Sequence, residues 1–528
     1  MQIVIPISDV DVHPLTAVDG RPIAEHVTGM FPGETDFIFI CSRAQLAEAG
    51  VVSGLRRVAP TSRIVAIEPH ALGPVYSTMQ AASIIENDTA VIVCRCDFAA
   101  NWDFAKFRKM VAQQPFDGAL MATRGFHPHQ CGRKRASWIR QANRRVVEIR
   151  DQYGFTSGEA QEYATCGAYY FRTGALLKHY LHRAMALGLS TQGEYNVGMP
   201  YNLMAQDGLS VHVEQVAQYA EWGTPEGLEQ YGRWSDFFAR WVDWTPASPV
   251  LAGATLIPIS GDAAVFPGGV YSELKPLFPV AGAPMIERTL RTLPPSMQTM
   301  ALCRGEDLKT TPLSRVVRTA RPGMRTISLN QKMERQACLC LIPDSAVDSR
   351  SPVLVAPSDA SLVYDEYEFA ATSAHADCVV FTFRDHPPAN RHPRQYNWTT
   401  AGVGGKMETI ALRSVPSGDI REARGLTGMF WFREAGAMFD AIRHWLDTGR
   451  RNTNDFSLEL ILESLIAAGY SVSALDVTHY IPFVTPADVQ TYEYWESFFQ
   501  KSARHPYGRQ KRIEPAFAVS FVGASAAA

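Results

Sequence analysis

The sequence has no long hydrophobic run, although 46% of its 528 residues are hydrophobic. No apolar stretch approaches the roughly 18 residues that a membrane-spanning helix requires. The first eight residues are typical of a β-strand and not of a signal peptide. We therefore expect a globular protein without a membrane span, located in the cytoplasm.

An excess of charge of one sign is also absent. The net charge is −3, from 50 Lys and Arg residues against 53 Asp and Glu residues, and the only basic block is Arg133-Lys134-Arg135. Proteins that bind nucleic acid usually carry larger basic patches. The composition therefore gives no reason to expect nucleic acid as a partner. The oligomeric state stays open, and a homo-oligomer is compatible with the sequence.

Cysteine is sparse, and its spacing does not favour zinc. The nine cysteines include two C-x-C pairs, Cys94/Cys96 and Cys338/Cys340. Each pair lies in an apolar context without a second pair at zinc-site spacing, which favours buried small hydrophobic residues. The segment with His127, His129 and Cys131 is more typical of a metal cluster. We nevertheless expect this histidine and cysteine segment to be a surface loop or a loop on the substrate side.

One pattern occurs twice along the chain. Residues 91–94 form a short apolar run that is soon followed by Asp97, as in a strand buried on both faces of a parallel sheet. The pattern returns 262 residues later and leads to Asp359. Further pairs at an offset of 261 are Gly167/Gly428, Thr224/Thr485, Tyr231/Tyr492 and Trp234/Trp495. The sequence therefore predicts two copies of one domain, residues 1–243 and 254–502, and a tail at 503–528.

Strand and helix patterns alternate along the first copy. Strands are expected at residues 3–7, 36–41, 63–68, 91–94, 118–123, 164–172 and 211–216. Helices are expected at residues 22–30, 42–49, 73–86, 105–112, 175–186, 194–206 and 225–240. This alternation predicts an α/β fold with βαβ units and a mostly parallel sheet. The second copy restarts at residues 255–260, after a linker rich in Pro and Gly.

Asp97 and Asp359 are expected at the carboxyl edge of the predicted sheets. Open α/β sheets bind ligands at this edge. Mg²⁺ prefers one or two carboxylates together with phosphate oxygens and water. An Asp in this place can also cap the following helix, as Asn101 or Asp103 could. The recurrence of the acid in both copies favours a functional role.

Several motifs together resemble the sugar-phosphate nucleotidyltransferases, in particular those of bacterial capsule and nucleotide-sugar biosynthesis. The resemblance is carried by Lys275-Pro-Leu-Phe-Pro-Val-Ala-Gly-Ala-Pro-Met-Ile286, Asp97, Asp359, Gly167-Ala-Tyr-Tyr-Phe171 and Gly223-Thr-Pro-Glu226. It implies two tandem Rossmann-like domains of the nucleotide-diphospho-sugar transferase (GT-A-like) fold. It also implies a reaction in which a sugar or polyol phosphate attacks the α-phosphorus of a nucleoside triphosphate and releases pyrophosphate, with Mg²⁺ as cofactor.

The resemblance further implies which residues form the site. In the family, a glycine-rich loop with a lysine beyond it approaches the phosphates, two acids hold Mg²⁺, and a second lysine binds the sugar phosphate. The expected catalytic residues are Lys275, Asp359 and Asp97. The expected metal ligands are Asp97, Glu221 and Asp359. The expected residues for binding the nucleotide and the sugar phosphate are Gly261, Gly268, Gly269, Lys275 and Arg413.

Copy one departs from the family pattern in its phosphate loop. Residues 8–14 contain no glycine and form a loop about ten residues shorter than the one in copy two, and His13 stands in the place of the loop lysine. Asp97 and Glu221 are kept, but the position of the sugar-phosphate lysine, near residues 150–152, holds no lysine. Retained polarity at the sheet rim explains the two acids equally well.

Copy two keeps the length of the loop, residues 261–275, but not the family's Gly-x-Gly-x-Arg. Asp262 adds negative charge near the phosphates. The counterpart of Glu221 is Pro482, so the second metal acid is missing, and Arg413 stands near the place of the sugar-phosphate lysine. We expect copy two to hold the nucleotide, because it has both the loop length and Lys275.

Three functions are compatible with these patterns. The first is a divergent nucleotidyltransferase of nucleotide-sugar or surface-polysaccharide biosynthesis. The second is a catalytically degenerate tandem repeat that binds nucleotide or sugar, or acts as a scaffold or regulatory partner. The third is a GT-A glycosyltransferase, whose Asp-x-Asp would be Asp9-Val-Asp11, although that pair follows the first strand and not the central one.

Overall fold

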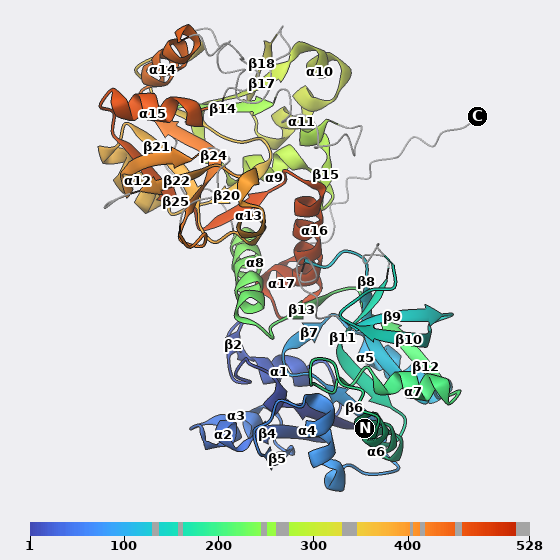
Figure 1. Ribbon diagram of the computed structural model, residues 1–528. Coiled ribbons are helices and arrows are strands. Elements are labelled where there is room, and N and C mark those ends of the chain that lie inside the picture. The colour runs from blue at the N-terminus through green and yellow to red at the C-terminus, as the bar shows by residue number, and fades with distance from the viewer. Residues whose placement is uncertain are drawn as a thin grey trace, which may run out of the picture. The chain divides into compact units, whose positions relative to one another are not determined.

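The computed structural model describes residues 1–128, 137–156, 162–243, 251–259, 274–329, 346–401, 405–411, 418–448 and 457–513 (Figure 1). The chain divides into two compact units. Unit 1 consists of residues 1–243 together with the C-terminal residues from Tyr494 onward, and unit 2 consists of residues 244–493. No helix in the described ranges is long and apolar enough to cross a membrane.

Unit 1 contains a nine-stranded sheet of order β5-β4-β1-β6-β11-β8-β12-β10-β9. Its strands are β1 (Gln2–Pro6), β4 (Phe37–Ser42), β5 (Arg63–Ile67), β6 (Val91–Cys94), β8 (Gly118–Arg124), β9 (Ser137–Ala142), β10 (Arg145–Asp151), β11 (Tyr163–Phe171) and β12 (Val211–Gln215). β1 is parallel to β4 and β6, whereas β11 is antiparallel to β6 and β8. The α/β class with parallel strands is confirmed, but the sheet is mixed. β11 lies between β6 and β8 in the sheet and runs opposite to both.

Helices cover both faces of this sheet (Figure 1). On one face, α4 (Pro74–Gln80), α6 (Gly174–Ala186) and α7 (Pro200–Gln206) pack against alternate strand residues such as Val4 and Val93. Ile3 and Ile5 point to the opposite face and are also fully buried. Further helices in the described part of the first 243 residues are α1 (Ile23–Thr28), α2 (Arg43–Ala47), α3 (Val51–Val58), α5 (Phe104–Gln113) and α8 (Pro225–Asp243).

Some elements of unit 1 differ from the prediction. The helix expected at residues 194–206 begins only at Pro200, where the missing N–H of proline is tolerated in the first turn. The helix α3 and the antiparallel pair β9 and β10 were not predicted. Short pairs complete the unit: β2 (Ala17–Val18) with β3 (Arg21–Pro22), and β7 (Phe98–Ala100) with β13 (Tyr219–Glu221). Short 3₁₀ turns are η1 (Ile7–Asp9) and η2 (Ala82–Ile84).

Unit 2 contains a sheet whose seven-strand path is β18-β17-β14-β19-β24-β21-β25. Its strands are β14 (Leu251–Ile259), β17 (Ser296–Arg304), β18 (Arg325–Leu329), β19 (Val353–Val355), β21 (Cys378–Phe383), β24 (Arg424–Phe432) and β25 (Val472–Asp476), with β22 (Trp398–Ala401) and β23 (Met407–Ala411) attached through β24. β24 is antiparallel to β19 and β21, as β11 is to its neighbours in unit 1. The path from β5 to β12 in the unit 1 sheet therefore matches the path from β18 to β25 in unit 2 strand by strand, with β11 and β24 as the antiparallel strands at the same place.

Two hydrophobic clusters lie on the two faces of the unit 2 sheet. One includes α14 (Ala435–Asp447) and α15 (Glu459–Ala467), and the other includes α9 (Met285–Thr292), α11 (Leu313–Ala320) and α12 (Glu366–His375). Other elements are α10 (Gly305–Thr310), α13 (Pro387–Arg391), η7 (Lys275–Leu277), η10 (Pro393–Gln395), and the pairs β15 (Pro279–Val280) with β16 (Ala283–Pro284) and β20 (Ala360–Val363) with β26 (His479–Pro482).

The C-terminal segment completes the core of unit 1. It comprises α16 (Pro486–Lys501) from Tyr494 onward and α17 (Pro506–Ile513). These residues pack on α8: the rings of Tyr231 and Trp495 lie 5.9 Å apart, and the ring of Phe238 lies 5.1 Å from that of Tyr507. Residues more than 250 positions apart thus form one apolar cluster, which no local sequence pattern could have indicated.

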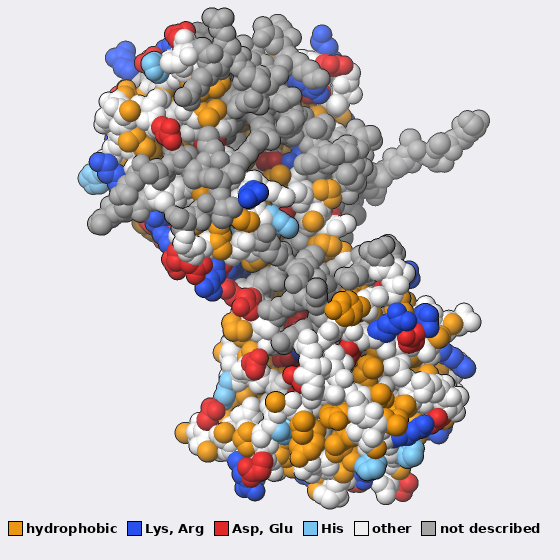
Figure 2. Space-filling view, in the orientation of Figure 1, with side chains coloured by type: hydrophobic (Ala, Val, Ile, Leu, Met, Phe, Trp, Pro, Cys, Tyr) orange, Lys and Arg blue, Asp and Glu red, His pale blue; other side chains and the backbone are white. Residues whose placement is uncertain are grey.

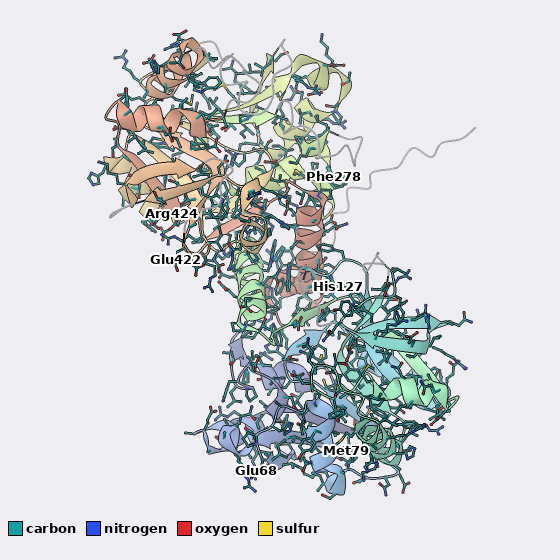
Figure 3. The ribbon with its side chains drawn as sticks, viewed as in Figure 1. Glu68, Met79, His127, Phe278, Glu422 and Arg424 are labelled. Atoms are coloured by element: carbon teal, nitrogen blue, oxygen red, sulfur yellow. The ribbon has the colours of Figure 1, made fainter. Side chains whose placement is uncertain are left out.

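Tyr494 connects this segment to strand β13. Its buried hydroxyl donates a hydrogen bond to the carbonyl of Tyr219 (2.6 Å) and accepts one from the N–H of the same residue (2.9 Å). His127 Nδ1 lies 3.1 Å from the same hydroxyl, and Figure 3 labels this histidine. Burial lowers the pKa of His127 to about 4, so this imidazole is neutral at pH 7. The hydroxyl therefore satisfies backbone groups that would otherwise be buried without partners.

We predict that Tyr494→Phe loosens strand β13. Removing the hydroxyl leaves a buried N–H and a buried carbonyl without this partner, which typically costs about 1–3 kcal/mol. Hydrogen–deuterium exchange should become faster over residues 219–221 and over β7. Tyr153→Phe, at a side chain that is 65% exposed, is the matched control and should change nothing. Equal exchange in the two variants would contradict the role given to Tyr494.

Candidate functional site

Each unit has an aspartate shortly after a central strand of its sheet. That strand is β6, beside β1, in unit 1 and β19, beside β14, in unit 2. Asp97 follows β6 and Asp359 follows β19. The backbone after each acid is held in the same way, because the N–H of Trp222 donates to the carbonyl of Asp97 and the N–H of Phe483 donates to that of Asp359, both at 2.7 Å. Both acids lie at the carboxyl edge of a sheet, where α/β proteins bind ligands.

Asp97 and Glu221, the expected metal pair, are brought together in unit 1. Glu221 pairs with Phe98 in the register of β13 and β7, which places it beside Asp97. Between the two carboxylates lies a cation that the sequence had not indicated. Arg95 Nη2 makes a short hydrogen bond to Asp97 Oδ2 and lies 3.7 Å from Glu221 Oε1. Burial lowers the pKa of Arg95, but the two carboxylates outweigh it and raise that pKa above its ordinary value.

The side chain of Asp97 is closely enclosed. The residue is only 3% exposed, and its Oδ1 atom is buried without a hydrogen-bond partner among the described residues. The backbone of Gly223 lies against the other oxygen: a Cβ atom at that position would stand 2.3 Å from Asp97 Oδ2. Any residue with a Cβ in place of the glycine of the Gly-Thr-Pro-Glu motif would therefore press on the carboxylate that Arg95 contacts.

The loop after β1 in unit 1 makes polar contacts with neighbouring segments. The Ser8 and Ser77 hydroxyls lie 3.1 Å apart, and Ser77 is 2.9 Å from His70 Nε2. Burial raises the pKa of the Asp9 carboxyl, with hydrogen bonds from Ser77 and Ser8 acting in the opposite direction. His13, in the place of the loop lysine, lies 3.3 Å from Glu48. These contacts leave the short loop without the open, cationic character that a triphosphate requires.

Lys275 and Asp359 are in direct contact in unit 2. Lys275 begins η7 and is 2% exposed, and its Nζ lies 2.5 Å from Asp359 Oδ2. The Asp359 side chain is 21% exposed, more than that of Asp97. Two of the three expected catalytic residues are thus brought together here. Asp97, the third, belongs to unit 1 and has its own cation.

Asp488 is a further acid near this pair that the sequence reasoning missed. Burial raises its pKa, hydrogen bonds from the Thr485 N–H and hydroxyl oppose that shift, and the charges of Lys275 and Asp359 also act on it. Because the same contacts cap the start of α16, a structural role accounts for them. Pro482 pairs with Ala360, so the place of Glu221 holds no acid in unit 2.

Signals for the missed residues were weak. Arg95 stands two residues before Asp97, but spacing alone does not show that it also faces Glu221, 126 positions later. Asp488 stands three residues after Thr485 and looks like an ordinary capping residue. The sequence shows which residues are close along the chain. The contacts of Arg95 and Asp488 depend instead on which distant segments the fold brings together.

Mg²⁺ fits the two units differently. In unit 2, Asp359 offers one partly exposed carboxylate, and one of its oxygens already contacts Lys275. An ion here would share the carboxylate with that lysine and take its other ligands from phosphate and water. In unit 1, Arg95 already lies against both acids. Among the described residues there is no group of three or more His, Cys, Asp or Glu side chains that could hold a metal ion. On the face shown in Figure 2, acidic and basic side chains are interspersed.

Other predicted site residues lie outside the described ranges. These are Gly261, Gly268, Gly269 and Arg413, together with Asp262, His129, Cys131, Cys338 and Cys340. Cys94 and Cys96 are buried, and burial raises the pKa of both thiols. They are therefore neutral at pH 7, as expected for small hydrophobic residues.

Known proteins resemble this chain in structure. No protein-family model and no curated protein matches the sequence. Similar solved structures include a nucleoside-diphosphate-sugar pyrophosphorylase from Vibrio cholerae RC9, with 17% identity, 44% of this chain and 100% of that chain covered, and a TM-score of 0.36. Another is the inositol-1-phosphate CTP transferase from T. maritima, with 14% identity, 43% and 91% covered, and a TM-score of 0.35.

We predict that Gly223→Ala destabilises unit 1. The added methyl group must displace Asp97 or the backbone, and such overpacking typically costs about 1–3 kcal/mol. Thermal unfolding should therefore shift down by several degrees. Gly232→Ala is the matched control, because nothing lies within 4 Å of the point where its Cβ would stand and alanine is favoured inside α8. An unchanged unfolding temperature for Gly223→Ala would contradict the close contact with Asp97.

Proposed function

We propose that the protein is a divergent sugar-phosphate nucleotidyltransferase whose unit 2 binds the nucleoside triphosphate. The observation that supports this most is the contact between Lys275 and Asp359 at the carboxyl edge of the sheet. The family resemblance implies that this lysine contacts the phosphates and that this aspartate binds the metal ion. We further propose a place in nucleotide-sugar or surface-polysaccharide biosynthesis, which the same resemblance implies.

The chemistry follows from how Lys275 is held. A buried ammonium needs compensating negative charge, and Asp359 supplies it. A triphosphate can take over this role, because Lys has a flexible stem and a compact charge that can move from one oxygen to another. Asp359 is then the residue that would hold Mg²⁺, which when bound would offset the phosphate charge. Alignment of the phosphates and charge neutralisation supply most of the catalysis in phosphoryl-group chemistry.

A second candidate is a catalytically degenerate repeat that binds nucleotide or sugar. It is favoured by the arrangement in unit 1, where Arg95 pairs with both retained acids, and by Pro482 in the place of the second acid in unit 2. The two candidates differ in turnover, since both allow a nucleotide to bind.

Turnover can be tested with a panel of nucleoside triphosphates and sugar or polyol phosphates in the presence of Mg²⁺. We predict pyrophosphate release for at least one pair, and its loss in Asp359→Asn, because the amide does not carry the charge that a cation needs. Asp365→Asn is the control, since Asp365 caps α12 through the N–H groups of Tyr367 and Glu368. Binding of nucleotide without any pyrophosphate release would favour the degenerate repeat.

Nucleotide affinity can be tested separately. Lys275→Ala should weaken triphosphate binding about tenfold or more, because a charge-assisted contact typically contributes about 1.5–3 kcal/mol. His13→Ala should change little, since His13 faces Glu48. Calorimetric titration of the full chain would measure both variants, with thermal unfolding to confirm that each is folded. The reverse ranking would place the nucleotide in unit 1 and refute this proposal.

A further inference from the structure

We propose that Arg95 takes the place of a divalent cation in unit 1, so that Asp97 and Glu221 bind no metal ion while it is present. This inference replaces the metal role that the family resemblance implies for the two acids. Only one consequence of this inference rests on the proposed function, namely that any metal-dependent chemistry of the protein takes place in unit 2.

The first argument is charge. The guanidinium of Arg95 touches Asp97 and lies 3.7 Å from Glu221, so it already bridges the two acids that would share a metal ion. An arginine does not lose its proton in a protein, so this positive charge is permanent. A dication between the same carboxylates would lie within a few ångströms of this fixed positive charge. The Arg95 side chain is 40% exposed and that of Glu221 is 26% exposed, so water partly screens this repulsion, which still opposes the binding of a dication.

The second argument is access. Mg²⁺ gives up its water reluctantly and usually keeps several water ligands in a protein. Asp97 Oδ2 is enclosed by Arg95 and by the backbone of Gly223, and Oδ1 is buried from solvent. Neither oxygen of Asp97 offers room for a hydrated ion, so the more exposed Glu221, at 26%, would be left as a single protein ligand. A guanidinium needs no such room, because it is planar and donates hydrogen bonds directly.

The two units place their cations at different positions in the chain. Two residues before Asp97 stands Arg95, whereas two residues before Asp359 stands Pro357. In unit 2 the cation is Lys275, which comes from η7 and touches the single acid that the family resemblance gives to the metal there. The carboxylate of Asp359 is also more exposed than that of Asp97. The exclusion of metal therefore applies to unit 1 alone.

Removing the arginine charge should create a metal site. The background is the full-length chain with Asp359→Asn, which silences the acid of unit 2. Free Mn²⁺ is then measured by electron paramagnetic resonance, without nucleotide. We expect Arg95→Gln in this background to gain one Mn²⁺ site, at least about tenfold tighter than any site in the background itself. Adding Asp97→Asn should remove the gained site. Arg172→Gln is the matched control, because Arg172 pairs with Asp117, and should gain none.

Glutamine is chosen because it keeps a donor toward Asp97, whereas alanine would leave a buried carboxylate without compensation. Mn²⁺ should also raise the unfolding temperature of Arg95→Gln but not that of the background, by preferential binding to the folded state. The inference is overturned if the background binds Mn²⁺ and loses it on Asp97→Asn, or if Arg95→Gln gains no site. Since the assay needs no turnover, its result is independent of whether the protein is a nucleotidyltransferase.

Discussion

A carboxylate enclosed at the edge of a sheet needs a positive charge beside it, and this requirement governs both units. The carbonyls of Asp97 and Asp359 each accept a backbone hydrogen bond from the residue just after a short strand, β13 or β26, and each carboxylate has a protein cation in contact. Without that cation the desolvation of the carboxylate would oppose folding. The local structure at each sheet edge therefore depends on an ion pair as well as on the apolar strands behind it.

The fold was predictable where its determinants are local. The apolar runs at residues 3–7 and 91–94 predicted strands that the structure places as β1 and β6, since a strand buried on both faces must be apolar throughout. The antiparallel direction of β11 was not predictable, because direction depends on the connection and not on side-chain pattern. Likewise, Asp97, Glu221, Lys275 and Asp359 could be named from motifs, whereas Arg95 could not, because its partners meet only when β7 pairs with β13.

The C-terminal segment shows the same limit on a larger scale. Tyr494 satisfies the backbone of Tyr219, and Trp495 packs on Tyr231, although each pair is separated by more than 260 positions. A chain ending at residue 243 would expose this apolar surface and would leave β13 without the Tyr494 hydroxyl. Since β13 also carries Glu221, the acid pair of unit 1 depends on residues from the end of the chain. Experiments on either acid are therefore meaningful only in the full-length protein.

The difference between an arginine and a lysine connects these observations to function. Arg95 bridges two carboxylates with a planar, permanently charged group, and the enclosed side chain of Asp97 gives that pair little freedom to rearrange. Lys275 contacts Asp359 with a point charge on a flexible stem, which can move from one oxygen to another. A fixed bridge stabilises a sheet edge, whereas an exchangeable contact can bind and release a ligand. On this physical ground, unit 2 is the better candidate for chemistry, and unit 1 is the better candidate for a supporting role.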